Sequence, residues 1–220
     1  MKILAVQSRM GIGDTVIFLP FIKALSKKFN SPISILVKEN SKANQYLHQT
    51  KYIDKILTLE RDNKTNNRHG GFFGIFKLAN DLKKYKFDKI FIFNSSLRFN
   101  LVAKISGIPQ IYQYPLFSKD KQHIIEAPKK FLKENLDLEI NEDPEVQIDS
   151  DLISKAAQKF QIDKKTTNIL LGIGGSGPTK RIPAKTFLSV IDKISNMKNC
   201  RFFLATGKAK EEQEVSLIHV

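Results

Sequence analysis

Short apolar runs alternate with segments of helical periodicity along most of the chain. Between Val16 and Leu25 apolar residues recur every three or four positions, which is typical of an amphipathic helix. Residues 90–93 are apolar at every position and indicate a strand buried on both faces. The expected elements are strand 2–7, helix 14–29, strand 32–38, helix 41–49, strand 55–60, helix 72–85, strand 88–93, helix 97–106, strand 110–114 and helix 123–135.

The alternation predicts an α/β fold in which helices cover a parallel sheet, as in a Rossmann-like domain. We expect this domain to span residues 1–148, followed by a linker helix within 149–166. The pattern then restarts in residues 167–220, with strand 168–173, helix 183–194, strand 201–205 and helix 208–218. Two strands and two helices are too few to cover both faces of a parallel sheet. We therefore expect an incomplete second domain, or one that finishes its sheet with a partner.

Composition excludes several classes of protein. The hydrophobic fraction of 41% is that of a globular protein, and no apolar run reaches the roughly 20 residues that span a bilayer. The first residues lack the pattern of a signal peptide, and a single cysteine, Cys200, excludes an internal disulfide framework. The four histidines lack metal-ligand spacing. These features favour a cytoplasmic protein without a metal.

The net charge of +14 allows two interpretations. It could serve an anionic partner such as a nucleic acid, a membrane face or a phosphorylated substrate. Alternatively, the lysines lie on solvated faces of a lysine-rich protein, since they are dispersed along the chain rather than clustered. The phenylalanines occur at core spacings, without the basic–aromatic pattern of an RNA-binding sheet, so no nucleic-acid partner is expected.

A glycine-containing turn, residues 11–14, joins the first strand to the first helix, where Rossmann-like domains bind their ligands. A dinucleotide fingerprint needs a third glycine, but Val16 stands there and Asp14 places a negative charge near the expected pyrophosphate. Glu39 is suitably spaced for a ribose contact, so a nicotinamide-dependent oxidoreductase stays an alternative. Asp14 could be a helix N-cap, a catalytic carboxylate or both.

A second glycine-rich segment, residues 172–181, nearly matches a P-loop. Pro178 occupies the position of the essential lysine and has neither a charge nor an N–H group, which argues against a nucleoside triphosphatase. Small residues and donors before a helix still suit an anion. The candidate donors are Ser176, Gly177, Thr179 and Lys180. The alternative is an ordinary flexible connection between a strand and a helix.

A third candidate segment follows the buried strand 88–93 and contains Asn94, Ser95 and Arg98. Its position again predicts the ligand-binding edge of the sheet. The alternative is a helix cap, with Ser95 or Ser96 at the N-cap position.

Together these motifs resemble glycosyltransferase family 9, the ADP-heptose:lipopolysaccharide heptosyltransferases, over nearly the whole chain. The opening strand, the Gly11–Asp14 turn and Leu19-Pro20 are similar to that family's start. The segments that carry the rest of the resemblance are 87–90, Asn94-Ser95, Arg98, 107–109, 169–175, 180–183 and Gly207 with Glu211. Gln113 stands where the family has glycine, and its later motif Asp-[Thr/Ser]-Gly-x-x-His does not occur in these 220 residues.

The resemblance implies a GT-B fold, with a Rossmann-like acceptor-side domain and the start of a nucleotide-sugar-binding domain. It implies an inverting, metal-independent glycosyltransferase without a cofactor, which moves heptose from ADP-heptose to an anionic lipopolysaccharide-type glycolipid. A peripheral contact with the cytoplasmic face of the inner membrane is compatible with such an acceptor. The implied residues are Asp14 for catalysis, Gly13, Asn94, Ser95 and Arg98 for the acceptor, and Ser176, Gly177, Thr179, Lys180 and Glu211 for the donor.

Two alternatives to a transferase stay open. One is a sugar- or nucleotide-binding protein without catalytic activity, because the second domain is incomplete. The other is the oxidoreductase, which binding of a nicotinamide cofactor would reveal.

Overall fold

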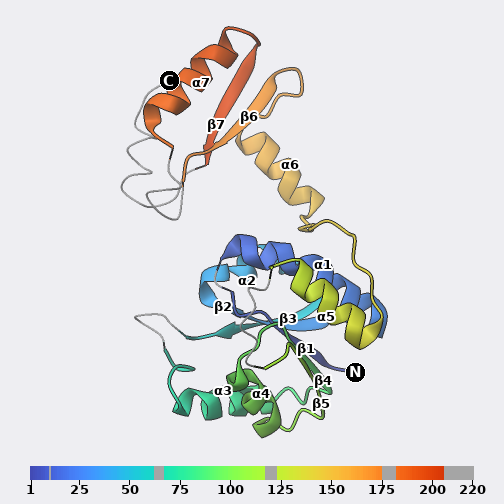
Figure 1. Ribbon diagram of the computed structural model, residues 1–220. Coiled ribbons are helices and arrows are strands. Elements are labelled where there is room, and N and C mark those ends of the chain that lie inside the picture. Colours follow the sequence, from blue (N-terminus) through green and yellow to red (C-terminus); the bar gives the residue numbers. More distant parts are fainter. Residues whose placement is uncertain (10, 62–66, 117–122, 175–181, 206–220) are drawn as a thin grey trace. The chain divides into compact units, whose positions relative to one another are not determined.

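The computed structural model of the chain describes residues 1–9, 11–61, 67–116, 123–174 and 182–205 (Figure 1). The chain divides into two compact units, Met1–Asp149 and Ser150–Val220, so that the expected linker helix is grouped with the second unit. Within the described residues, no helix is both long and apolar enough to cross a membrane.

The first unit is a five-stranded, entirely parallel sheet with the strand order β3-β2-β1-β4-β5. Its strands are β1 (Ile3–Val6), β2 (Ile33–Lys38), β3 (Ile53–Leu59), β4 (Lys89–Ile92) and β5 (Gln110–Gln113). Its helices are α1 (Ile12–Phe29), α2 (Ala43–Tyr46), α3 (Phe73–Lys83), α4 (Leu97–Ile105) and α5 (Glu126–Leu136). The Rossmann-like domain expected from the sequence is thereby confirmed.

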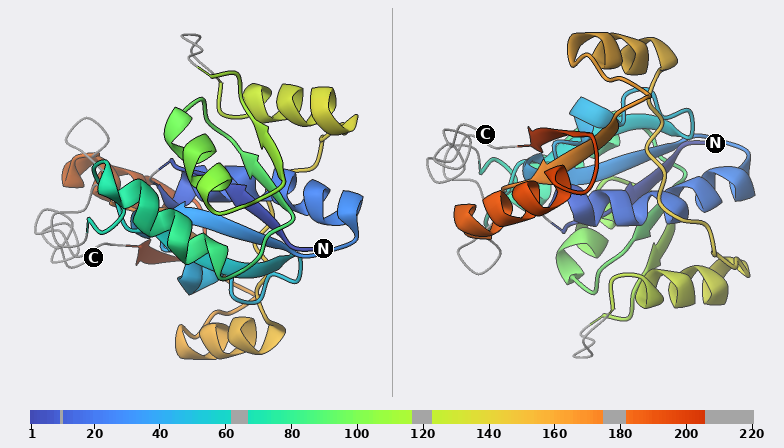
Figure 2. Two further views of the ribbon diagram at one scale, coloured as in Figure 1. Left: turned by 90° about the horizontal axis from the view of Figure 1, so that it is seen from below. Right: turned by 90° about the horizontal axis from the view of Figure 1, so that it is seen from above.

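Two apolar layers hold helices on both faces of this sheet. Alternate strand residues such as Ile3 and Phe91 pack with α1, α2 and α5, whereas Leu4 and Ile90 pack with α3 and α4. Figures 1 and 2 show the same arrangement, with α3 and α4 together on one side of the sheet. The burial of β4 on both faces agrees with its unbroken apolar sequence.

The starts of α1 and α2 differ from the expected ones. Helix α1 begins at Ile12, so Asp14 is its third residue and the predicted N-cap role is wrong. Gly11 is the N-cap instead, because its backbone is extended and its carbonyl accepts the Thr15 N–H at 3.3 Å. Helix α2 is shorter than expected, because a 3₁₀ turn (Glu39–Ser41) and a left-handed Lys42 (φ 49°) precede it.

Helix α4 ends where the sequence predicts. Gly107 has a φ of +75°, a conformation that favours glycine, and its N–H bonds to the Lys104 carbonyl at 3.0 Å. The next N–H, that of Ile108, bonds to the Ala103 carbonyl at 3.1 Å. The chain then turns directly into β5.

The acidic stretch of residues 141–149, which precedes α6 in the chain, lies along the first unit. Glu142 forms an ion pair of 2.9 Å with Lys23 of α1 and a second one with Lys27. Hydrogen bonds from Lys23 and Lys27, opposed by slight burial and aided by their charges, hold the pKa of the Glu142 carboxyl below its usual value. Further on, Gln147 Oε1 accepts the Lys51 N–H at 3.0 Å. This stretch is thus part of the first unit.

The second unit contains two parallel strands, β6 (Thr167–Gly172) and β7 (Cys200–Ala205), and the helices α6 (Ser150–Lys159) and α7 (Ala184–Ser195). The sequence predicted Pro183 as the first residue of a helix. In the structure Pro183 is the N-cap of α7, one position before the first helical residue. Among the described residues of this unit, only Ile173 and Ile191 are buried apolar residues. The helix expected at 208–218 lies outside the described residues.

Candidate functional site

The candidate site lies at the switch point of the parallel sheet. Strand β1 pairs with β2 on one side and with β4 on the other. The chain leaves β1 into α1, on one face of the sheet, and leaves β4 into α4, on the opposite face. The loops after these strands therefore diverge, and such a crevice is where open α/β sheets bind ligands.

The two loops touch each other at this point. Asn94, which follows β4 by two residues, donates from Nδ2 to Ser8 Oγ after β1 at 3.3 Å. The Asn94 Oδ1 accepts the Ser96 N–H at 3.0 Å, which closes a tight turn before α4. Ser96 is the N-cap residue of α4 but makes no side-chain cap bond, so the Asn94 side chain does part of that work.

The carboxylate of Asp14 is held at the same edge of the sheet. Its Oδ2 accepts the Gly11 N–H at 2.9 Å, and the buried Gln7 donates to the Asp14 carbonyl at 3.2 Å. The first turn of α1 favours a negative charge there, because the helix dipole is positive at this end. Within the described part of the chain, no hydrogen bond reaches Oδ1. One oxygen thus fixes the half-buried group while the other can meet a ligand.

Gly13 leaves the surface beside Asp14 open. It is exposed, and a Cβ added there would meet no atom within 4 Å. A ligand can therefore approach the backbone of the first helical turn closely, as the sequence pattern suggested.

Gln113, at the end of β5, holds the turn that contains Asn94 through side-chain hydrogen bonds. Its Nε2 donates to the Asn94 carbonyl at 3.1 Å and to the Ser96 carbonyl at 2.9 Å. Its Oε1 accepts from Asn100 Nδ2 of α4 at 2.9 Å. A glycine here would leave both carbonyls without this donor, so the departure from the family pattern has a clear structural role.

Replacing Gln113 by glutamate should destabilise the first unit by roughly 1–3 kcal/mol, because a carboxylate of the same shape would face two carbonyl oxygens. Urea unfolding of Gln113→Glu and of Gln110→Glu, an exposed position on the same strand, measures the difference. An unchanged stability of Gln113→Glu alone would contradict the role of this amide as a fastener.

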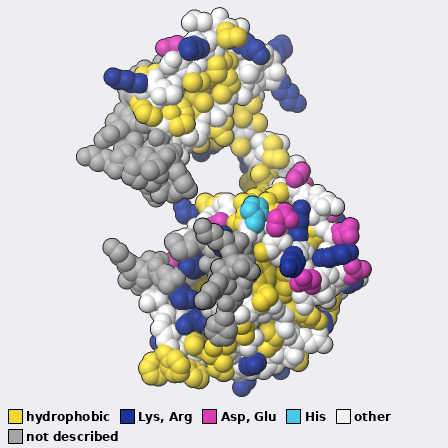
Figure 3. All heavy atoms as spheres, viewed as in Figure 1, with side chains coloured by type: hydrophobic (Ala, Val, Ile, Leu, Met, Phe, Trp, Pro, Cys, Tyr) yellow, Lys and Arg dark blue, Asp and Glu magenta, His cyan; other side chains and the backbone are white. Residues whose placement is uncertain are grey.

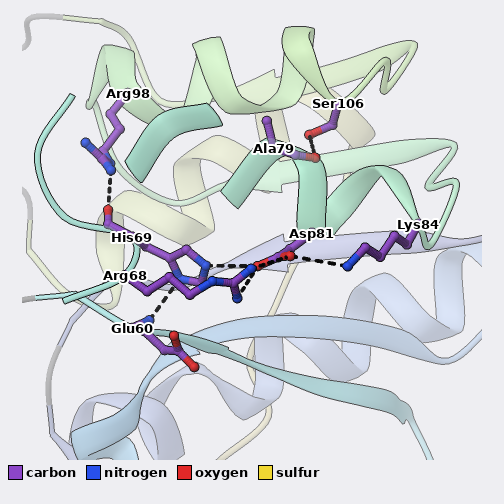
Figure 4. Close-up of polar contacts among 8 residues, drawn as sticks. All are labelled: Glu60, Arg68, His69, Ala79, Asp81, Lys84, Arg98 and Ser106. Atoms are coloured by element: carbon purple, nitrogen blue, oxygen red, sulfur yellow. Dashed lines mark hydrogen bonds and ion pairs between the residues drawn. The ribbon is translucent and has the colours of Figure 1, made fainter. Parts of the chain in front are cut away.

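Arg98 is the second residue of α4, and its side chain bonds to the segment before α3. Its Nη1 donates to the Gly71 carbonyl at 2.8 Å, and its Nη2 donates to the His69 carbonyl (Figure 4). Part of its hydrogen-bonding capacity thus fixes this loop. A contact between Arg98 and an acceptor stays a prediction.

The same loop is pinned by a buried histidine. The His69 Nδ1 accepts the Glu60 N–H at 3.1 Å, so the ring proton lies on Nε2, which faces Asp81 Oδ2 at 3.1 Å (Figure 4). Arg68 binds the Asp81 carboxylate with both terminal nitrogens: Nη1 lies 2.6 Å from Oδ2, and Nη2 donates to Oδ1 at 2.8 Å. These residues border a hollow of about 300 Å³ between β3 and α3.

The pKa of the Asp81 carboxyl reflects this setting. Partial burial would raise the pKa, but hydrogen bonds from Arg68 and His69, together with the charge of Arg68, outweigh it and lower the pKa below its usual value. The folded state therefore favours the charged carboxylate. This charge stabilises the fold at pH values above the unfolded pKa of about 3.9, and the stabilisation is lost as the pH falls through the lower pKa of the folded state.

The structure brings Asp14, Gly13, Asn94 and Ser95 to one edge of the sheet. The predicted donor residues Ser176, Gly177, Thr179, Lys180 and Glu211 lie outside the described residues. Sequence reasoning missed Ser8 and the buried His69, and it noted Gln113 only as a departure from the family pattern. Ser8 could have been noticed, because it is a polar residue directly after a predicted strand.

No protein-family model matches this sequence, and no curated protein matches it. Solved structures do. A glycosyl transferase of family 9 from Veillonella parvula superposes with a TM-score of 0.76 at 18% identity, over 97% of this chain and 66% of its own length. The Escherichia coli ADP-heptose lipopolysaccharide heptosyltransferase II gives a TM-score of 0.68 at 17% identity, over 98% and 68% of the two chains.

An Escherichia coli heptosyltransferase with ADP-2-deoxy-2-fluoro heptose gives a TM-score of 0.63 at 13% identity, over 98% of this chain and 71% of that one. This chain thus spans about two thirds of the length of these proteins. At such low identity the likeness concerns the fold, and it confirms the predicted α/β architecture of GT-B type.

Proposed function

We propose that this protein is a glycosyltransferase that moves a sugar from a nucleoside-diphosphate donor to a glycan acceptor. The observation that carries the proposal is the joined pair of loops at the switch point, where Ser8 and Asn94 meet beside the carboxylate of Asp14. The likeness of fold to glycosyltransferases supports it.

The finer proposal is heptose transfer, with inversion and without a metal, onto a lipopolysaccharide-type acceptor. It is supported by the resemblance in motifs and by the nucleotide sugar named with one of the similar structures. Asp14 acts as the base: its carboxylate takes the proton of the acceptor hydroxyl while that oxygen attacks the anomeric carbon. The bond from this carbon to the diphosphate breaks, and the nucleoside diphosphate leaves with its electron pair.

The remaining residues bind and position. Asn94, Ser95, Arg98 and the open backbone at Gly13 hold the acceptor. Lys180, with Ser176, Gly177 and Thr179, stabilises the negative charge that develops on the leaving diphosphate. Glu211 accepts from the ribose hydroxyls of the donor. A purely binding protein would need the same pockets but would not need the positioned carboxylate.

Release of nucleoside diphosphate tests the proposal. The protein is incubated with ADP-heptose, ADP-glucose or a UDP-sugar, and with a deacylated, water-soluble lipopolysaccharide core as acceptor. Acceptor-dependent release of ADP with ADP-heptose, insensitive to a chelator and with inverted anomeric configuration by NMR, is the expected result. Binding of nucleotide sugar without any turnover would favour the binding protein, and tight NADH binding would favour the oxidoreductase.

A further inference from the structure

Three phenylalanine rings stand out of the surface at the start of α3. The exposed fractions of Phe72, Phe73 and Phe76 are 69%, 77% and 48%, which is far more than a soluble surface usually shows for this residue type. The ring of Phe72 contacts those of Phe73 and Phe76, with centroids 6.0 and 5.7 Å apart. The rings therefore form one apolar cluster, the yellow group at the lower left of Figure 3.

Helix α4 continues the apolar surface. Leu97, Leu101 and Ile105 are exposed and follow one another at four-residue spacing, so they form a stripe along one side of the helix. Both helices bury their opposite sides against the sheet, and they pack side by side (Figure 2). The cluster on α3 and the stripe on α4 consequently lie on one outer surface, here called the α3–α4 face.

The charge of this face is positive. Lys77, Lys83, Lys84 and Lys104 are all exposed on or next to these two helices. The only acidic residue within α3 and α4 is Asp81, which Arg68 and His69 bind and which Lys84 meets in an ion pair of 3.5 Å. On α5, by contrast, Glu126 and Glu134 accompany the lysines. Asp81 thus offsets only part of the positive charge of the α3–α4 face.

We propose that the α3–α4 face docks on the surface of an anionic lipid bilayer. Exposed aromatic side chains and lysines on one face suit the boundary between headgroups and acyl chains, where the aromatic rings enter the apolar layer and the ammonium groups meet phosphates. A protein partner that buried the three phenylalanine rings would have to bring acidic side chains to meet the lysines. A bilayer of anionic lipids supplies negative charge at every point of its surface. The inference rests on the proposed function in one respect: a glycolipid acceptor would be presented in such a bilayer.

Sedimentation with vesicles tests this docking. The protein is mixed with vesicles of phosphatidylcholine alone or of phosphatidylcholine with phosphatidylglycerol, at low and at high salt. Binding to the anionic vesicles only, weakened by salt, is expected. The variant Lys77→Glu should bind at least fivefold more weakly, since each lysine near such a surface contributes about fivefold. The double variant Phe72→Ser, Phe73→Ser should bind at least tenfold more weakly.

Matched controls separate this face from general charge and hydrophobicity. Lys130→Glu changes an exposed lysine of α5, and Met197→Ser removes an exposed apolar side chain of the second unit, so both should bind vesicles like the wild type. Circular dichroism confirms that each variant is folded. Absent binding to anionic vesicles, or equal loss in the controls, would overturn the proposal. So would a wild-type protein that self-associates in light scattering through the same phenylalanines.

Donor turnover with the water-soluble acceptor distinguishes this proposal from the preceding one. Variants of the α3–α4 face should keep that turnover while losing vesicle binding. Vesicle binding by a protein that transfers no sugar would leave the docking surface intact and would contradict the proposed transferase.

Discussion

Replacing Asp14 by asparagine is expected to lower the turnover number by about 10²–10⁴-fold, the usual effect of losing a general base. Asparagine keeps the size of the side chain and an oxygen that can accept the Gly11 N–H, but it cannot take a proton. The lost charge at the start of α1 costs at most about 1 kcal/mol of stability. We therefore expect nearly unchanged melting and donor affinity together with a large fall in turnover.

Asp137→Asn is the matched control for this experiment. Asp137 is an exposed carboxylate after α5 with a left-handed backbone (φ 54°), a conformation that asparagine adopts readily. The control loses one surface ion pair with Lys133 and should turn over donor like the wild type. If Asp14→Asn also kept wild-type turnover, the carboxylate would serve only to accept the Gly11 N–H, and the proposed mechanism would lose its base.

Replacing Gly74 by alanine should destabilise the first unit by about 1–3 kcal/mol, as overpacking of a filled interior does. A Cβ at this position would come within 3.0 Å of both the carbonyl carbon and the carbonyl oxygen of His69. The obstacle is backbone, so the segment before α3 must move and the bonds from Arg98 to that segment must weaken. Chemical denaturation measures the loss, and turnover should fall with it if this loop helps to hold the acceptor.

Gly13→Ala shows whether the effect belongs to the site or to the residue type. Gly13 also lies in the first turn of a helix, but an added Cβ would meet open space there. Alanine favours helices over glycine, so the stability of this variant should be unchanged or higher by up to about 1 kcal/mol. An equal loss in both variants would mean that the contact with His69 does not cause the destabilisation of Gly74→Ala.

The regular elements could be predicted because the pattern of apolar residues indicates each of them over several positions. The strand at 88–93 has apolar residues at every position, and such a run can be buried only between two helical layers, as β4 is. Helix α4 ends within one residue of the predicted position 106, where Gly107 takes a left-handed conformation that glycine favours. Helix α2 was overestimated, because the left-handed Lys42 gives no signal in its residue type.

The edge of the sheet could be predicted as a site, but the hydrogen bonds that hold its loops in place could not. Position after a strand was enough to select Asp14 and Asn94, since parallel strands end at one edge. The partners of Asn94 come from residues far away in the chain: Ser8 lies 86 positions earlier and Gln113 lies 19 positions later. The motif predicted an acceptor contact for Arg98. It could not predict the two hydrogen bonds from Arg98 to the carbonyls of His69 and Gly71, because these depend on the path of the backbone there.

The strand order has a consequence for how this molecule is made. The strand β1 leaves the ribosome first, but its neighbour β4 and the asparagine that completes the site follow 86 positions later. At about 5–20 residues per second, this interval lasts roughly 4–17 seconds. Throughout it, one edge of a strand that is entirely buried in the finished protein stays unpaired. The nascent chain is therefore exposed to misassembly until residue 94 emerges, and the site cannot form before then.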